Sequence, residues 1–358
     1  MRVRDSWYGN PLYVQAKRWL FEFLFHSGLL GIFRFLRRHD VLIAIYHDVL
    51  PAGFPEDNPL FGMAASVEEF AWQLDYFKKH YNPISFEQFS DWYLHGRELP
   101  SRPVLITFDD GHRNNLRFAL PVLQQKQVTA VCFVLTGEIG ACRQTWFEDA
   151  YYRLMFSTVK SWTLRNGECW PLQNGQQRAA ACGKFFVLCR TLPEREQQEE
   201  LSSLRDQLPV TRADAELADR FEFLSADDVR RLSESGIEIG SHTVSHPILV
   251  ALQPEDAKRE IADSKAALEK VLGKPVRAFA YPFGAPSLDF TSRDEALVEE
   301  SGYSFAFAGE GGFATRSSNR FRMPRTGIGR MTRAQFAIIV AGADASLKRM
   351  LALGRRGE

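Results

Sequence analysis

The sequence predicts an α/β fold in which parallel strands alternate with helices. Its main indication is a series of short, fully apolar runs, each ending at a polar or glycine-containing turn, as buried strands do. The first is Val-Leu-Ile-Ala-Ile-Tyr at 41–46, followed by His47-Asp48. Similar runs lie at 103–108, 128–135, 237–239, 278–281 and 303–308. Helical patterns separate these runs, and that rhythm indicates parallel β/α units.

The helical segments carry apolar residues three or four positions apart, the spacing of one helix face. Helices are predicted on this ground at 67–80, 85–95, 116–123 and 255–272. Ser66 followed by Glu69 predicts a capping box at the start of the first helix. Gly273 and Pro275 predict the end of the last one.

The chain divides into three predicted parts. Residues 1–40 form an N-terminal helical segment, residues 41–345 the main domain, and residues 346–358 a basic tail. Within the main domain the strand–helix rhythm stops at about 141–222, where a charged helical pattern occupies 194–208. We interpret this stretch as a mostly helical insertion.

The N-terminal segment contains an apolar stretch at 19–33, which is shorter than the roughly 20 residues that cross a bilayer. One interpretation is an amphipathic helix packed on the main domain, which is the commoner outcome. The other is peripheral membrane contact through residues 19–38, with Arg34, Arg37 and Arg38 facing lipid head groups.

The overall composition is that of a globular protein, with 45% hydrophobic and 25% charged residues. Lysine plus arginine and aspartate plus glutamate number 44 each, so no net charge attracts nucleic acid, and nucleic-acid binding is not expected. The five cysteines contain no C-x-x-C pair and indicate neither a disulfide framework nor a thiolate zinc site. Together with a start that does not resemble a secretory signal, they predict a cytoplasmic protein, with the inner membrane face as the alternative.

Two pairs of polar residues directly follow predicted strands. Asp109 and Asp110 are followed by Gly111, which lets the backbone turn so that both carboxylates can approach one point. His242 and His246 are four residues apart, and two imidazoles at this spacing can reach one zinc ion from a single turn. Either pair alone is more often a helix cap or a surface feature. Because the carboxyl ends of parallel strands share one edge of a sheet, we expect the pairs to meet there.

A third motif, Phe279-Ala280-Tyr281-Pro282-Phe283-Gly284, also runs from a predicted strand into a turn. By itself it is only an aromatic turn. Beside the other two motifs it could supply a backbone N–H and an aromatic wall for a sugar ring. The candidate residues for this contact are Tyr281, Pro282, Phe283 and Gly284.

The motifs T-F-D-D-G, S-H-x-x-S-H and F-A-Y-P-F-G together resemble those of the NodB-homology polysaccharide deacetylases, carbohydrate esterase family four. The likeness extends over 41–140 and 222–330 and is closest to members with a Tyr-Pro-Phe-Gly turn. It implies an irregular, TIM-like (β/α)7-8 barrel with a divalent metal at the carboxyl ends of the strands. The insertion and the N-terminal helix would be additions to that barrel.

Carried over by position, the resemblance makes Asp109 the catalytic base and Asp110, His242 and His246 the metal ligands. Such a set leaves a coordination position open, as a catalytic zinc site requires. The expected metal is Zn²⁺, with Co²⁺, Ni²⁺ or Mn²⁺ as alternatives. The backbone N–H of Phe283 would stabilise the oxyanion.

The chain departs from the family pattern at two places. Ala280 or Tyr281 stands where many relatives have an arginine, with Arg277 the nearest arginine along the chain. No histidine follows His246 to act as general acid, and the corresponding strand ends in Arg325. Arginine is a poor proton donor, since its pKa lies above about 12.

Arg325 could instead orient Asp109 or bind an anionic part of the substrate. Two other residues are candidates for the general acid: His47, which follows the first strand, and His112, which follows the Asp-Asp-Gly turn. Either could equally be a structural hydrogen-bond donor. The Tyr-His-Asp strand end, which is common in the resembling subgroup, favours His47.

The function expected from this resemblance is metal-dependent removal of the N-acetyl group from an N-acetylhexosamine, in a polysaccharide or a lipid-linked glycan precursor. A glycan is therefore the expected partner. Two alternatives remain open: a deformylase or small cyclic amide hydrolase using the same site, and a non-catalytic protein that binds metal and glycan.

Overall fold

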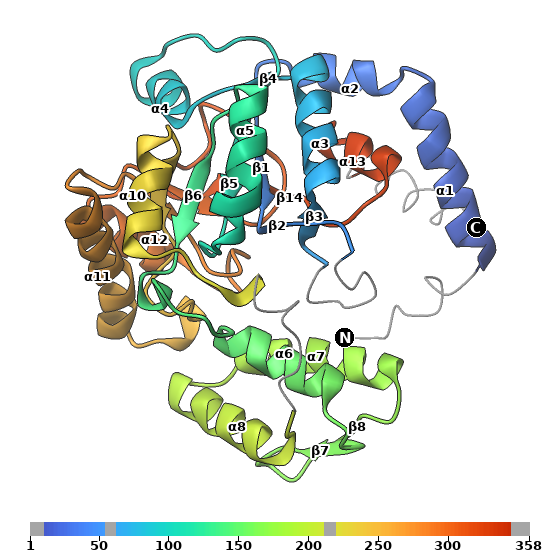
Figure 1. The fold of residues 1–358 in the computed structure, drawn as a ribbon, viewed down its shortest axis with the longest axis vertical. Helices are drawn as coiled ribbons and strands as arrows, with labels where there is room; N and C mark the ends of the chain where they lie inside the picture. The colour runs from blue at the N-terminus through green and yellow to red at the C-terminus, as the bar shows by residue number, and fades with distance from the viewer. Residues whose placement is uncertain (1–10, 54–61, 211–219, 345–358) are drawn as a thin grey trace.

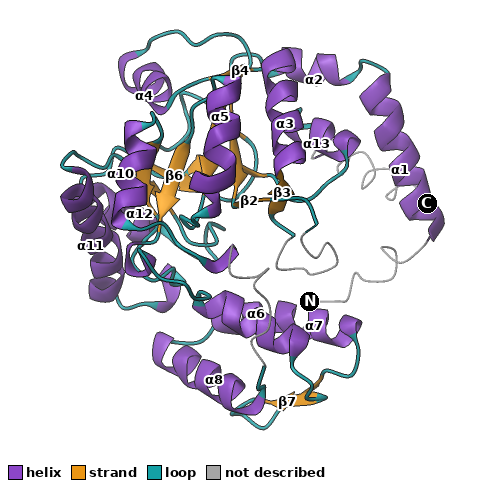
Figure 2. Cartoon of the chain, in the orientation of Figure 1, coloured by secondary structure: helices purple, strands orange, loops and turns teal. Residues whose placement is uncertain are grey.

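A curved, mostly parallel sheet forms the centre of the computed structural model, which describes residues 11–53, 62–210 and 220–344. Helices surround the sheet in Figure 2. The sheet has ten strands, and its main path runs β12-β1-β5-β6-β9-β10-β11-β13. These strands are β12 (Phe313–Ala314), β1 (Val41–Tyr46), β5 (Pro103–Phe108), β6 (Val131–Val134), β9 (Glu238–Ser241), β10 (Ala278–Ala280), β11 (Phe305–Ala308) and β13 (Met323–Pro324).

Two strands at the end of the chain nearly close the sheet into a barrel. β13 pairs in parallel with β11, and β14 (Thr326–Gly327) pairs in parallel with β1 at the other end of the path. Only Arg325 separates β13 from β14. The predicted irregular (β/α) barrel is therefore confirmed, and the strand expected to end in Arg325 is the short β13, with β14 directly after the arginine.

The strands form where the sequence has uninterrupted apolar runs. Every residue of β1, β5, β6, β10 and β11 is buried, as expected for parallel strands covered on both faces. Within the runs predicted at 128–135 and 303–308, only the residues of β6 and β11 form strands. The strand predicted at 237–239 begins one residue later and extends to Ser241, as β9. Apolar side chains just outside these strands, such as Val128 and Tyr303, still pack in the core without joining the ladder.

Most helices around the barrel follow the predicted spacing. α3 (Val67–His80) begins at the Ser66–Glu69 capping box, and α11 (Pro254–Leu272) ends at Gly273, whose φ is 67°. The helix predicted at 116–123 is a π-helical turn followed by α5 (Leu120–Lys126). The other barrel helices are α4 (Phe86–His95), α10 (Ala226–Glu234), α12 (Ser292–Glu300) and α13 (Arg333–Val340).

The predicted insertion forms a separate lobe, seen below the sheet in Figure 1 on the side to which the arrow of β6 points. It contains α6 (Trp146–Phe156), α7 (Gly175–Cys189) and α8 (Glu194–Gln207), and a hairpin of β7 (Ser161–Thr163) and β8 (Cys169–Pro171). The lobe has its own hydrophobic cluster, in which Trp162, Phe185 and Leu201 are buried. The insertion is thus mostly helical, as expected, and it faces the carboxyl ends of the strands.

The N-terminal segment contains two helices rather than the single one expected over 19–33. α1 (Pro11–His26) and α2 (Leu30–Leu36) are separated by a break at which Gly28 has a φ of 78°. Leu24 and Leu30 pack on the main domain, and α1 lies beside α13 (Figure 1). No single described helix combines the length and apolarity of a membrane span; only the bent pair 18–26 and 30–36 meets both criteria together. The basic tail predicted at 346–358 lies outside the described residues.

Candidate metal and catalytic site

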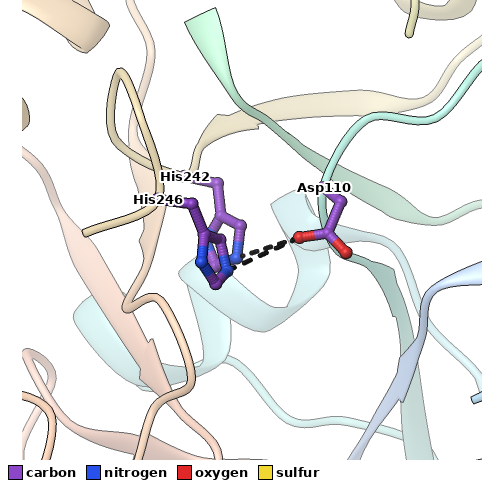
Figure 3. Close-up of side chains that lie close together, drawn as sticks. All are labelled: Asp110, His242 and His246. Carbon is purple, nitrogen blue, oxygen red and sulfur yellow. Dashed lines mark ion pairs between the residues drawn. The ribbon is translucent and has the colours of Figure 1, made fainter. Parts of the chain in front are cut away.

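Asp110, His242 and His246 meet at the carboxyl ends of β5 and β9 (Figure 3). The Nε2 atoms of both histidines lie 3.6 Å from Oδ1 of Asp110. All three residues are buried, and their ligand atoms lie within 4.8 Å of one another. The structure therefore brings together the three residues predicted to bind metal.

The backbone at this site adopts conformations that most residues avoid. Asp110, Thr243, His246 and Phe283 have φ values between 58° and 72°, in the left-handed region. They make up four of the seven non-glycine residues with positive φ in the described chain. Each such residue costs about 1–3 kcal/mol, so the surrounding structure must hold them in place. Strained residues of this kind cluster at functional sites, so their concentration here supports this region as the candidate site.

Hydrogen bonds fix the two imidazoles. Nδ1 of His242 lies 2.8 Å from the carbonyl oxygen of Ala280, so that Nε2 points toward Asp110. The loop before His246 is held by Glu260 of α11, which accepts hydrogen bonds from the backbone N–H groups of Val244 and Ser245. Burial, and next the charge of His242, lower the pKa of His246 well below its usual value. His246 is therefore neutral, the form that ligates metal.

The donor set fits a divalent cation. Oδ1 of Asp110 is buried and has no hydrogen-bond partner among the described residues, which is costly unless a positive group faces it. Two imidazoles and one carboxylate suit zinc and leave a coordination position open.

Whereas Asp110 faces the two histidines, its neighbour Asp109 pairs with an arginine. Arg325 donates two hydrogen bonds to its carboxylate, with Nη1–Oδ1 and Nη2–Oδ2 distances of 2.7 and 2.8 Å. Burial would raise the pKa of Asp109, but the charges of Arg325, His242 and His47 lower it to about 2. The carboxylate is therefore ionised and held in a fixed orientation. Of the two roles considered for Arg325, this geometry supports orientation of Asp109.

Arg277, the arginine nearest the third motif in sequence, does not reach the site. It pairs with Glu87 and Glu238, and its guanidinium stacks over Phe86. The arginine beside Asp109 is instead Arg325, which lies between β13 and β14.

A cavity of about 440 Å³ opens at the metal cluster. Its floor contains Asp109, Asp110, His242 and His246, and Arg325 also borders it. Its other wall comes from the insertion, and the sequence did not predict that the insertion would line the cavity. The residues on this wall are Phe147, Glu148, Tyr151, Phe186, Arg190 and Arg220.

The lobe also contacts the metal site directly. Nε1 of Trp146 donates a hydrogen bond of 2.9 Å to the carbonyl oxygen of His246. The rings of Phe147 and Phe283 each lie 4.6 Å from the imidazole of His246, measured between centroids. Helix α6 therefore supports one of the candidate metal ligands.

The two candidate acids have different surroundings. His47 lines the cavity, and its Nδ1 has no hydrogen-bond partner within the described ranges. His112 is fully buried and does not line the cavity; its Nδ1 lies 2.9 Å from Oδ1 of Asp48. Although burial opposes it, the charge of Asp48 raises the pKa of His112. The structure thus brings His47, and not His112, to the cavity.

His112 belongs to a buried ionic network that joins the lobe to the barrel. Arg220 pairs with Asp48, at 3.2 Å between Nε and Oδ2, and with Glu148 of α6. Asn114 donates a further hydrogen bond of 2.7 Å to Asp48. Both carboxylates are fully enclosed, so the network depends on each member.

The third motif reaches the cavity only in part. Phe283 borders the cavity, and its backbone N–H has no hydrogen-bond acceptor in the described part of the chain. Gly284 packs against Gly309, where a Cβ would lie 2.6 Å from the Gly309 nitrogen. Tyr281 is buried away from the cavity, stacked on Phe290 at 3.7 Å with its hydroxyl bonded to the carbonyl oxygen of Phe321. Pro282 and Gly284 also lie outside the cavity lining, so Phe283 alone has the position expected of this motif.

Comparison with known proteins gives a consistent result. A family model described as polysaccharide deacetylase matches residues 96–305. YxkH of Bacillus subtilis (strain 168), itself only provisionally named a polysaccharide deacetylase, is 26% identical over 105 residues, or 29% of this chain and 36% of the relative. The poly-β-1,6-N-acetyl-D-glucosamine N-deacetylase of Escherichia coli (strain K12) is 31% identical over 94 residues, or 26% of this chain and 14% of the relative. The matches thus cover about a third or less of these relatives.

Two solved structures have the same fold. The Streptococcus pyogenes deacetylase PplD, in complex with acetate, superimposes with a TM-score of 0.56 at 16% identity, covering 84% of this chain and 97% of that one. The polysaccharide deacetylase BC0361 from Bacillus cereus gives a TM-score of 0.54 at 18% identity, covering 85% of this chain and 69% of that one.

Proposed function

The chain belongs to the polysaccharide deacetylase family, and from this premise we propose that it is a zinc-dependent hydrolase that removes the N-acetyl group from an N-acetylhexosamine of a glycan. The observation that carries the proposal is the placement of the Asp110, His242 and His246 cluster beside a separate, ionised Asp109 in one cavity. The relative from Escherichia coli is named for the same type of bond cleavage, which supports an acetylated amino sugar as the substrate.

The proposed reaction uses one base, one oxyanion donor and one acid. A divalent ion held by the cluster would activate water and polarise the amide carbonyl. Asp109 accepts the proton of the attacking water, and Arg325 keeps its carboxylate aimed at that position. The N–H of Phe283 donates to the oxygen that becomes negatively charged.

Collapse of the tetrahedral species breaks the carbon–nitrogen bond, leaving acetate and the free amine of the sugar. The leaving nitrogen needs a proton at this step, and His47 is the histidine on the cavity wall placed to donate it. The aromatic side chains of Phe147, Tyr151 and Phe186 would line the path of the sugar ring.

Removing the metal tests the central claim. Dialysis of the purified protein against a chelator should abolish acetate release from N-acetylglucosamine oligomers, and adding Zn²⁺ back should restore it. Elemental analysis should find about one zinc per chain in the wild type and far less in His242→Ala, since a lost ligand typically reduces metal affinity strongly. His95→Ala, at an exposed helix end, is the matched control and should keep its metal.

The outcome that would contradict the proposal is acetate release unchanged by metal removal. Release of formate from an N-formylated sugar in place of acetate would keep the site but change the substrate. Metal and glycan binding without any product would support the non-catalytic alternative.

The two histidines outside the metal cluster give a second test. His47→Gln should reduce kcat by about 10²-fold or more, because the leaving amine loses its proton donor, with metal content and thermal stability nearly unchanged. His112→Gln should instead mainly lower the melting temperature, because it removes a buried partner of Asp48. If kcat falls more in His112→Gln than in His47→Gln, the assignment of the acid is wrong.

A further inference from the structure

The two N-terminal helices expose an unusual number of large apolar side chains. Six of the eleven that are exposed in the described chain lie between residues 19 and 36. We call them the outer face: Trp19, Phe23, Leu29, Ile32, Phe35 and Leu36. Trp19 and Leu36 are 76% and 71% exposed. Isolated exposed apolar residues are normal, but six of them on two consecutive helices indicate a contact surface.

The opposite side of the same helices is already used for packing. Leu24 and Leu30 are buried there, and Phe21, Phe25 and Phe33 pack against the core of the main domain. α1 and α2 are therefore apolar on two sides. A surface helix with one buried apolar stripe normally has polar residues on its solvent-exposed side. Because the outer face is apolar, we expect it to contact a second apolar environment.

The charge around the outer face favours a lipid surface of negative charge. Residues 11–40 contain five basic and two acidic residues, although the whole chain is neutral. Arg18 is exposed beside Trp19, and the guanidinium of Arg38 lies 4.3 Å from the centroid of the Phe35 ring. Tryptophan and arginine next to each other at the edge of an apolar surface are typical of segments seated at the membrane–water interface.

The shape of the segment fits contact with one leaflet. The axes of the two helices differ by 71° across the break at residues 27–29, and neither helix alone is long and apolar enough to cross a bilayer. We propose that the outer face binds the surface of an anionic lipid bilayer, with Trp19, Phe23 and Phe35 inserted at head-group level and Arg18 and Arg38 beside the phosphates. This proposal does not depend on the deacetylase reaction.

Vesicle flotation of the full chain tests this contact. The wild type should float with vesicles of phosphatidylcholine mixed with phosphatidylglycerol, and much less with phosphatidylcholine alone. The variant Trp19→Ser/Phe23→Ser/Phe35→Ser should lose at least about tenfold in vesicle binding, because buried apolar area provides most of the affinity. The matched control replaces three exposed apolar residues elsewhere, as Phe156→Ser/Val187→Ser/Leu288→Ser, and should float like the wild type.

A second variant tests the charges. Arg18→Ala/Arg38→Ala should bind the two kinds of vesicle almost equally. Added salt should likewise remove the preference of the wild type for the anionic vesicle, because it screens the charges. Acetate release from a soluble oligomer, together with the melting temperature, should be unchanged in all these variants, which shows that they are folded.

Three results would overturn the proposal. The first is failure of the wild type to float with either vesicle, and the second is flotation of the triple outer-face variant to the same extent as its control. Alternatively, light scattering could show a dimer of the wild type that this variant dissociates, which would make a second copy of the chain the occupant. None of these results bears on the metal site, so the two proposals fail independently.

Discussion

Replacing Asp109 by asparagine should lower kcat for acetate release by about 10²–10⁴-fold, the usual contribution of a general base, while the metal stays bound. The expected cause is chemical: an amide has nearly the same shape as the carboxylate but cannot accept the proton of the attacking water. Asp110, which is the candidate ligand, is unchanged. The measurements are steady-state kinetics on an N-acetylglucosamine oligomer and elemental analysis of the same sample.

This substitution also leaves the guanidinium of Arg325 buried without its counter-charge, so a loss of folding must be distinguished from a loss of chemistry. The double variant Asp109→Asn/Arg325→Met removes both charges and should recover stability without recovering activity. Hydrolysis by Asp109→Asn at the rate of the wild type would show that Asp109 is not the base.

Replacing Arg220 by methionine should destabilise the protein by about 3–5 kcal/mol, the cost of removing one partner from a buried ionic network. Arg220 balances two enclosed carboxylates, Asp48 at the end of the first strand and Glu148 in the lobe. Without it both negative charges remain in a low-dielectric environment. Chemical denaturation followed by circular dichroism measures the change in the free energy of unfolding.

The matched control is Arg230→Met, which breaks an exposed ion pair with Asp227 and should cost no more than about 1 kcal/mol. Equal effects of the two substitutions would mean that the network around Asp48 contributes little to stability. A change confined to the lobe would appear as a separate unfolding transition at lower denaturant concentration.

The same network predicts how stability depends on pH. Burial would raise the pKa values of Asp48 and Glu148, but the charges of Arg220 and His112 hold both below their usual values. Carboxylates with lowered pKa values stabilise the fold above their unfolded pKa, about 4, and this contribution disappears as the pH falls through the folded value. Unfolding free energies should therefore decrease below about pH 4. In Arg220→Met the folded-state pKa values of both carboxylates should be higher, so the loss of unfolding free energy below that pH should be smaller than in the wild type. An equal loss of unfolding free energy on acidification in the variant and the wild type would contradict this.

The barrel and the meeting of the three candidate metal ligands could be predicted because the features that produce them are local in sequence. Each buried strand is a continuous apolar run, and the candidate ligands Asp110, His242 and His246 stand directly after such runs. Parallel strands bring their carboxyl ends to one edge, so the position of a residue along the chain already determines where it lies in space. The capping box at Ser66 is local in the same way.

The residues that the sequence did not reveal depend on contacts between distant parts of the chain. Glu148 and Arg220 are 72 positions apart and meet only because the lobe folds back over the strand ends. The orientation of Tyr281 could have been predicted, because residues two apart in a strand share a face and Phe279 belongs to the core. Ser27-Gly28 likewise indicated a break in the N-terminal helix, which its uniformly apolar surroundings obscured.

The seam of the barrel has a mechanical consequence for catalysis. Arg325 is the single residue between β13 and β14, the two strands that join the ends of the sheet. The guanidinium that orients Asp109 is therefore attached at this joint. Any widening of that joint would draw the two charges apart and release the carboxylate. If Asp109 is the base, as proposed, activity would therefore depend on the pairing of β13 and β14, and loosening these two short strands would lower the rate before the protein unfolded.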